Sequence, residues 1–301
     1  MTKPTLFKQK FVKDKCQFEE FLFHNFTNLH RYKNCEYERK INYCDDKNLY
    51  LNLCYPKSRD TTKLPIFIYI HGGGWISSKP ENREGFVSNI VEKGFFTLNI
   101  FYGLAPEYQH PKPIVNIYKA LAWLVNNASK YNLDLDNIYL GGESAGAHLI
   151  AVMGAICSNE EYKNKFNLDT TSKDLIFKGL YLICGIYDME ECMNSKFPFM
   201  QCFVTSYSGK NYEMLRKDSK SAELFPQSFV NENYPKSFII TANLDQLRTG
   251  GKKFYEHLCA NNVPCKLYHC TGLYAFHAFG VALILPKARE AFIQGFDFLL
   301  S

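Results

Sequence analysis

The sequence has no long uninterrupted apolar run and no block of like charges. No stretch approaches the roughly 18 consecutive apolar residues of a membrane-spanning helix, and the opening stretch MTKPTLFKQKFVKDKCQFEE never builds the apolar core of a secretory signal. The net charge of +5 is spread along 301 residues, which argues against nucleic-acid binding. These absences predict a cytoplasmic protein without a membrane span and without a nucleic-acid partner.

Paired cysteines and cofactor motifs are also missing. The eleven cysteines are scattered from Cys16 to Cys270, with no CxxC pair and no zinc spacing. We therefore expect reduced thiols and no bound metal. The glycine-rich stretch at residues 71–75 has neither the GxGxxG pattern nor the lysine-serine ending of a phosphate-binding loop, so no organic cofactor is expected either.

Strand-like runs alternate with amphipathic helical stretches over most of the chain. The run IFIYI, which leads into three glycines, is typical of a strand buried on both faces. Such alternation predicts one α/β fold with a mostly parallel sheet, helices on both faces and ligands at the carboxyl ends of the strands. The predicted strands are residues 49–56, 66–70, 95–102, 137–142, 178–188, 236–245 and 264–270, and the predicted helices are residues 85–94, 112–133 and a stretch from about 145.

Two segments fall outside this alternation. Up to about residue 40 the pattern is partly helical, strand patterning begins near residue 43, and residues 49–56 resemble an edge strand. We expect residues 189–229 to interrupt the alternation as an excursion of the chain that lies over one end of the sheet. The N-terminal stripe, which we expect to cover other parts of the protein, consists of Phe18, Phe21, Leu22, Phe26 and Leu29.

A candidate nucleophile lies in the sequence GGESAG at residues 141–146. The GxSxG pattern centred on Ser144 follows a predicted strand and precedes a predicted helix, which is the setting of a nucleophile elbow. We expect side chains at Gly142 or Gly146 to collide with neighbouring backbone in such a turn. The competing interpretation is a glycine-rich turn whose serine caps the helix.

A serine nucleophile needs a base and an acid that orients the base. Asp245 ends a predicted strand, and His277 follows the last one, so the order is serine, aspartate, histidine, as in the α/β-hydrolase arrangement. Asp188 also follows a strand and is the alternative acid. His269 within a strand and His257 within a helix are expected to be structural.

The HGGG stretch predicts an oxyanion hole. Glycines present backbone N–H groups without an intervening side chain, and such donors stabilise the negative oxygen that forms when a serine attacks an acyl carbonyl. We expect these donors to be Gly73, Gly74 and Ala145, and His71 to hold the loop.

With these motifs the sequence resembles the hormone-sensitive-lipase-type carboxylesterases of the α/β-hydrolase superfamily. The matching blocks are HGGGW at residues 71–75, YGLAPE at 102–107, GESAG at 142–146, and DQLR with FHAF near the C-terminus. The resemblance implies the α/β-hydrolase fold and a triad of Ser144, Asp245 and His277. It also implies a small helical cap, formed by residues 1–45 and an excursion at about 189–230, on a catalytic domain of residues 46–301.

Three positions depart from the family pattern. Gly103 stands where an arginine is usual, so a salt bridge to Glu107 is expected to be missing. Glu143 replaces the commoner aspartate beside the nucleophile. Thr249 replaces an acidic residue, which weakens the alignment that selects Asp245.

The sequence thus predicts a serine hydrolase that cleaves small carboxylic esters with short acyl chains. An amidase or arylformamidase with the same triad is the nearest alternative, and a small-molecule-binding relative without catalysis is another. The short-chain preference rests on the resemblance, on the small cap and on the expected lack of an interfacial apolar segment. Homodimerisation is compatible with the sequence. The predicted pocket walls are Trp75, Tyr108 and Phe276.

Overall fold

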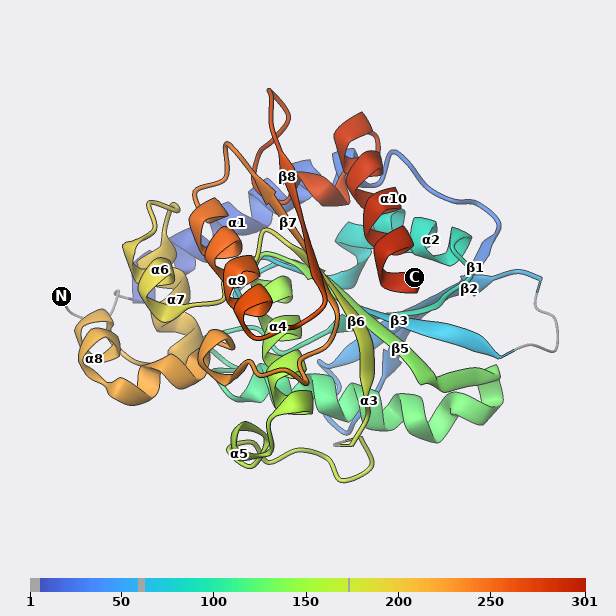
Figure 1. Ribbon diagram of the computed structural model, residues 1–301, viewed down its shortest axis with the longest axis horizontal. Helices are drawn as coiled ribbons and strands as arrows, with labels where there is room; N and C mark the ends of the chain where they lie inside the picture. The colour runs from blue at the N-terminus through green and yellow to red at the C-terminus, as the bar shows by residue number, and fades with distance from the viewer. Residues whose placement is uncertain (1–5, 59–62, 173) are drawn as a thin grey trace.

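An eight-stranded sheet forms the centre of the protein (Figure 1). The computed structural model describes residues 6–58, 63–172 and 174–301. The strand order is β1-β2-β4-β3-β5-β6-β7-β8, parallel from β4 to β8, with β2 antiparallel to both of its neighbours. The strands are β1 (Cys35–Asn42), β2 (Tyr50–Pro56), β3 (Leu64–Ile70), β4 (Phe96–Phe101), β5 (Leu133–Glu143), β6 (Phe177–Ile183), β7 (Ser237–Ala242) and β8 (Cys265–Cys270).

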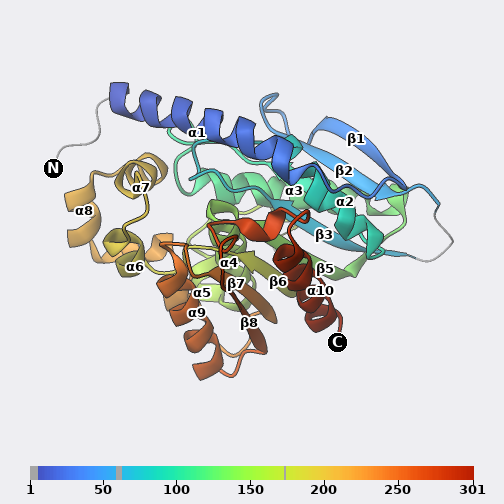
Figure 2. The same ribbon diagram turned by 90° about the horizontal axis from the view of Figure 1, so that it is seen from above.

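Helices cover both faces of this sheet (Figure 2). One face carries α2 (Glu84–Glu92) and α10 (Pro286–Leu300). The opposite face carries α3 (Lys112–Tyr131), α4 (Ala145–Ser158) and α9 (Arg248–Ala260). The prediction of a mostly parallel sheet between two helical layers is therefore confirmed.

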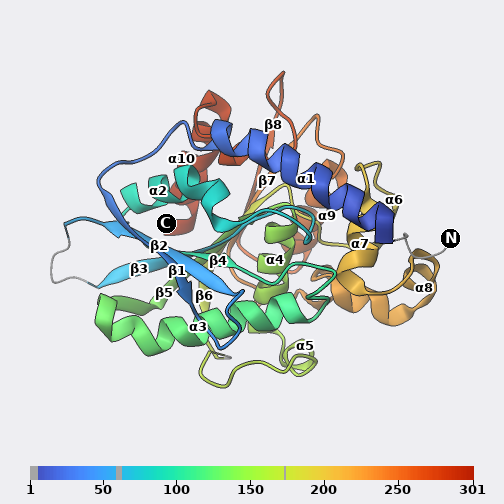
Figure 3. The ribbon, with the colours of Figure 1, turned by 180° about the vertical axis from the view of Figure 1, so that it is seen from behind.

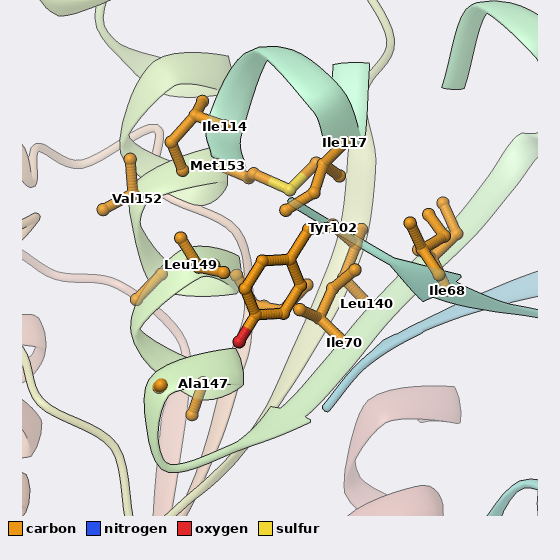
Figure 4. Packing of buried hydrophobic residues seen from close by; sticks show 14 of the residues in the cluster. Ile68, Ile70, Tyr102, Ile114, Ile117, Leu140, Ala147, Leu149, Val152 and Met153 are labelled. Carbon is orange, nitrogen blue, oxygen red and sulfur yellow. The ribbon is translucent and has the colours of Figure 1, made fainter. Parts of the chain in front are cut away.

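The strand β3 shows how the sequence builds this core. Side chains alternate across a strand, so Ile68 and Ile70 pack towards α3 and α4 while Phe67 and Tyr69 pack towards α2 and α10. All four side chains are fully buried. Figure 4 shows the first of these two clusters, in which the isoleucines lie near side chains of both helices. Burial on both faces explains why the run reads as continuously apolar rather than alternating.

The edge of the sheet differs from the prediction. Residues 35–42 form β1, which pairs antiparallel with β2, so β2 is not the edge strand and helical structure does not extend to residue 40. The sequence CEYERKIN gave little apolar signal because, of its eight residues, only Cys35 is buried. A solvated edge strand rich in charged residues is one of the ways in which proteins protect sheet edges.

The N-terminal helix α1 (Leu6–Thr27) lies across the carboxyl-end side of the sheet (Figure 3). Its orientation differs from the prediction, because Phe18, Phe21 and Leu22 are exposed by 63%, 63% and 55%. Leu29, beyond the helix, is also exposed, and of the predicted stripe only Phe26 packs against the core. The inward face instead carries Val12 and Cys16.

The segment between β6 and β7 is mostly helical and lies at the end of the molecule near the start of α1, as Figures 1 and 2 both show. Two short helical elements lie elsewhere: α5 (Glu160–Lys163) after α4, and η4 (Phe279–Val281) before α10. A further short element, η1 (Pro80–Arg83), contacts α1. The helical elements of the segment between β6 and β7 are α6 (Met189–Asn194), α7 (Met200–Ser208), α8 (Tyr212–Lys217), η2 (Ser219–Leu224) and η3 (Gln227–Phe229).

Across the described ranges, no helix combines the length and the apolar character that crossing a bilayer would require.

The close packing of α10 on the sheet can be tested at Gly295. A Cβ atom there would lie 2.3 Å from Cε2 of Tyr181 and 2.9 Å from Cδ1 of Phe238. We expect Gly295→Ala to lower the free energy of unfolding by about 1–3 kcal/mol, because overpacking outweighs the gain of up to about 1 kcal/mol in helix propensity. Urea denaturation measures the change.

Gly250→Ala in α9 is the matched control. Its Cβ atom would meet only Cβ of Glu191, at an ordinary 3.5 Å, so this variant should keep or slightly raise stability. Equal stabilisation by both substitutions would contradict the packing argument.

Candidate active site

The candidate catalytic side chains follow neighbouring strands. Ser144 comes directly after β5, Asp245 follows β7 and His277 follows β8. The strands β5, β6, β7 and β8 are consecutive in the sheet and parallel, so their carboxyl ends share one edge. The glycine loop after β3, the other neighbour of β5, reaches the same edge.

The turn at Ser144 has the geometry of a nucleophile elbow. Ser144 has φ 53° and ψ −118°, and its N–H donates to the carbonyl of Ile183 at 2.8 Å. A Cβ atom at Gly142 would lie 2.6 Å, and one at Gly146 2.0 Å, from the carbonyl oxygen of Ile70. The predicted collisions are therefore confirmed. Ser144 makes no side-chain cap on α4, which removes the support for the helix-cap interpretation.

Asp245 and His277 form a hydrogen bond. Nδ1 of His277 lies 3.0 Å from Oδ1 of Asp245, and the same oxygen accepts the N–H of Leu247 at 2.9 Å. Burial alone would raise the pKa of Asp245, but the neighbouring His277 and these hydrogen bonds outweigh it and lower the pKa. An ionised Asp245 selects the imidazole tautomer with its proton on Nδ1, which leaves Nε2 free to accept a proton.

The alternative acid and the other histidines have separate partners. Asp188 caps α6 by accepting the N–H of Glu191 at 2.9 Å. His269 lies in β8, where its Nδ1 is 2.9 Å from Oγ1 of Thr241, and His257 lies in α9. The structure thus brings Asp245, and not Asp188, to His277.

The glycine loop adopts backbone conformations that side chains disfavour. Gly73 has φ +101° and Gly74 has φ +61°, and a Cβ atom at Gly73 would lie 2.3 Å from the carbonyl oxygen of Ser77. Within the described ranges, neither glycine N–H donates to a protein acceptor. Ala145 is the buried first residue of α4, where helix N–H groups have no partner within the helix. The predicted donors therefore lie on the two segments that flank Ser144.

His71 and Trp75 secure this loop at its two ends. His71 is fully buried, stacks on Tyr102 with 4.7 Å between ring centroids, and has its pKa lowered to about 4 by burial. Trp75 donates its Nε1–H to Nδ1 of His148 at 3.1 Å and stacks on Tyr207 of α7. These contacts agree with a structural role for His71, and they connect the loop to α4 and α7.

Ser144 and His277 both line a cavity of about 540 Å³. Glu20 of α1 and Arg83 also lie at its wall. A cavity of this size can hold a small organic molecule. Its apolar walls come mainly from α1, the glycine loop, the segment around α7 and the loop after β8, and include Leu22, Phe23, Trp75, Phe197, Met200, Phe203 and Phe276.

Trp75 and Phe276 thus lie where the sequence predicted pocket walls, but the prediction for Tyr108 is wrong. Tyr108 is not part of this cavity and donates its hydroxyl to Oδ2 of Asp46 at 2.5 Å. A Cβ atom at Gly103 would lie 2.2 Å from the Tyr108 ring, so the glycine makes room for this orientation. That contact also explains why no arginine stands at position 103; Glu107 instead lies 3.6 Å from Lys13 of α1.

A buried ion pair beside the nucleophile was not predicted from the sequence. Arg83 is 2% exposed, and its Nε donates to Oε1 of Glu143 at 2.7 Å. The other end of the guanidinium contacts Glu20 of α1 at 3.0 Å. Nothing in the stretch PENREG distinguishes a buried arginine from a surface one, so the sequence alone could not have identified this pair.

One group near the site has donor atoms close enough to suit a metal ion. Cys184, Asp245 and His277 each place one such atom within 4.8 Å of the others, and within the described ranges no other set of His, Cys and acidic side chains does so. Burial, with the charge of Asp245, raises the pKa of the Cys184 thiol well above its ordinary value. Nδ1 of His277 and Oδ1 of Asp245 are already bonded to each other at 3.0 Å, so these residues suit the hydrogen-bonded pair better than a metal.

A family model and several known proteins resemble this chain. The BD-FAE family matches residues 51–249, which is more than half of the chain. An Acanthamoeba polyphaga mimivirus protein, named as an alpha/beta hydrolase, is 28% identical over 76% of this chain and 65% of its own length. Esterase LipC of Mycobacterium tuberculosis is 29% identical over 54% of this chain and 40% of its own length. The chain thus spans less than two thirds of both relatives.

Among solved structures, Esterase B of Lactobacillus rhamnosis superimposes with a TM-score of 0.83 at 20% identity, over 97% of this chain and 95% of that one. This likeness establishes the shared fold. The predicted membership of the α/β-hydrolase superfamily is confirmed.

The choice of acid is tested by matched substitutions. We expect Asp245→Asn to lower kcat for p-nitrophenyl butyrate by about 10³–10⁴-fold, because the amide no longer fixes the tautomer of His277. Asp188→Asn, which alters only the cap of α6, should change kcat by less than about threefold. Steady-state kinetics, with circular dichroism as a folding control, decides between them; a larger loss from Asp188→Asn would reverse the assignment.

Proposed function

We propose that this chain, which belongs to the BD-FAE family, hydrolyses small carboxylic esters through a covalent acyl-enzyme. The observation that carries the proposal is the shared cavity: Ser144 in a strained elbow and His277 bonded to Asp245 face the same space. A serine, a buried carboxylate and a histidine in this chain order are the parts of an acyl-transfer site.

The first half of the reaction acylates Ser144. The Oγ atom attacks the carbonyl carbon of the ester while Nε2 of His277 takes its proton, and Asp245 stabilises the resulting imidazolium. The carbonyl oxygen becomes negative and is held by the N–H groups of Gly73, Gly74 and Ala145. Each such donor contributes on the order of 10²–10³ in rate. The C–O bond then breaks, and His277 returns the proton to the departing alcohol.

The second half repeats these steps with water. His277 takes a proton from a water molecule as its oxygen attacks the acyl carbon, and the same donors hold the second oxyanion. Collapse of this intermediate returns the proton to Oγ of Ser144 and releases the carboxylic acid. Neither half requires a cofactor.

The cavity favours a compact apolar substrate. Its walls are largely apolar, and α1 and the segment around α7 bound it. Short acyl chains fit this enclosure, and Esterase B, which shares the fold, has been solved with a tributyrin phosphonate inhibitor. The exposed Phe18 and Phe21 of α1 weaken the argument from the lack of an interfacial apolar segment, so the short-chain proposal rests on the cavity walls.

The two alternatives receive less support. An amidase or arylformamidase would use the same triad, but LipC and Esterase B are both named esterases. A binding protein without catalysis would not need an acid bonded to His277, and this pair is present at 3.0 Å.

The division into a cap and a catalytic domain remains our proposal. The predicted cap boundary at residue 45 takes in β1, which belongs to the sheet, so we assign to the cap only the N-terminal segment before β1, of which residues 1–5 lie outside the described residues. The rest of the cap is the excursion at about 189–230, which is inserted in the catalytic domain of residues 46–301. Side chains of α1 and of the segment around α7 wall the cavity, which supports this division. We place the protein in the cytoplasm, because no disulfide joins the cysteines of the described residues and thiols persist in reducing compartments. Homodimerisation remains a prediction.

Acyl-chain preference tests the proposed function. We expect p-nitrophenyl acetate and butyrate to be cleaved with kcat/KM at least about tenfold above that of the palmitate ester, because side chains of α1 and of the segment around α7 bound the space beside Ser144. Ser144→Ala is the control and should abolish turnover of all three esters. Palmitate as the best substrate would refute the short-chain claim, and full activity of Ser144→Ala would refute the mechanism.

A further inference from the structure

We propose that Arg83 is a positioning residue of this site, through which Glu20 of the N-terminal helix α1 holds the nucleophile turn and the oxyanion loop in their reactive arrangement. This inference rests on the proposed esterase function. It assigns to α1 a second role besides walling the cavity.

The contacts of Arg83 use all three nitrogens of its guanidinium. Nε donates to Oε1 of Glu143 at 2.7 Å, and the two terminal nitrogens meet the two carboxylate oxygens of Glu20, each at 3.0 Å. One terminal nitrogen also donates to the carbonyl of Asn82 at 3.2 Å. A planar guanidinium held at several points has one orientation, so it fixes the position of both carboxylates.

Glu143 connects Arg83 to both the nucleophile turn and the glycine loop. It directly precedes Ser144, and its Oε1 also accepts the N–H of Gly72 at 2.8 Å. Its Oε2 accepts the hydroxyl of Tyr69 in β3. One carboxylate therefore ties the end of β5 to the loop that carries Gly73 and Gly74. A shift of Glu143 would move the nucleophile and the predicted oxyanion donors relative to each other.

Glu20 supplies the contact from α1. Besides Arg83, its Oε2 accepts the hydroxyl of Ser78 at 3.0 Å and Nδ2 of Asn82 at 3.1 Å. Both partners follow the glycine loop in the chain. Burial would raise the pKa of Glu20, but Arg83 and the hydrogen bond from Ser78 outweigh it and lower the pKa. Glu20 thus faces the loop as a carboxylate and not as a neutral acid.

The charges in this cluster depend on one another. Burial alone would lower the pKa of Arg83, but Glu20 and Glu143 together outweigh burial and raise this pKa above its ordinary value. Without Glu20, the guanidinium keeps Glu143 but loses its bidentate partner and is free to tilt. Without Arg83, two carboxylates remain near each other with no cation between them, which a buried site tolerates poorly.

The test measures binding of the oxyanion separately from folding. A trifluoromethyl ketone with a short alkyl arm adds to the serine and places a negative oxygen among the oxyanion donors, so its Ki reports their alignment. We expect Glu20→Gln to lower kcat for p-nitrophenyl butyrate about tenfold and to weaken the ketone by a similar factor, with KM within about twofold. Arg83→Met should lower kcat, and raise the Ki of the ketone, by about 10²–10³-fold.

Two further variants separate positioning from stability. Arg83→Lys keeps the cation without the planar fork and should recover part of the loss. Arg31→Gln removes an arginine that pairs with Glu84 at 3.1 Å outside the cavity, and it should leave kcat and Ki unchanged. If Arg83→Met does not fold, Glu20→Gln and Arg83→Lys carry the test.

The outcomes are distinct when kcat is expressed per active serine titrated with a fluorophosphonate. A lower melting temperature with unchanged kcat and Ki in Glu20→Gln and Arg83→Lys would overturn the positioning role and leave the esterase proposal intact. An inactive wild-type enzyme would overturn the esterase proposal itself. A parallel loss of kcat and ketone affinity at unchanged KM supports the inference.

Discussion

The close approach of the nucleophile turn to the end of β3 is the constraint on which the site depends. The carbonyl oxygen of Ile70 occupies the space that a Cβ atom of Gly142 or Gly146 would need. This contact brings α4 against β3 and lets the chain reverse within the few residues around Ser144. It also sets the glycine loop beside the turn, because Gly72 follows Ile70 by two residues. The positive φ angle of Ser144 is the conformational cost, which the surrounding packing sustains, whereas Gly73 and Gly74 adopt positive φ angles without a Cβ penalty.

Features set by local sequence could be predicted. The strand β3 and the turn at Ser144 each depend on residues adjacent in the chain: a run of large apolar side chains in one case, and glycines flanking a serine in the other. Parallel strands then bring Asp245 and His277 to the same edge, because every carboxyl end lies there. The order of motifs was therefore enough to propose which residues meet.

Features set by contacts between distant residues could not be predicted. The face that α1 turns inward is decided by Glu20 meeting Arg83, 63 residues later. Apolar periodicity favoured the face with Phe18 and Phe21, which the structure leaves in solvent. Tyr108 likewise turns away from the cavity because Asp46, 62 residues earlier, accepts its hydroxyl. In each case one polar partner outweighed a pattern that sequence analysis could detect.

The buried cluster around Arg83 is better explained by geometry than by stability. Removing charges from water costs free energy that a salt bridge often fails to recover, and apolar residues of similar volume can be at least as stabilising. Stability alone would not require a buried arginine that is hydrogen-bonded to both Glu20 of α1 and Glu143 of β5. Apolar packing sets distances loosely, whereas charge-assisted hydrogen bonds fix orientation. Because an oxyanion site depends on alignment within fractions of an ångström, directional contacts at Glu143 serve that requirement in a way that apolar packing cannot.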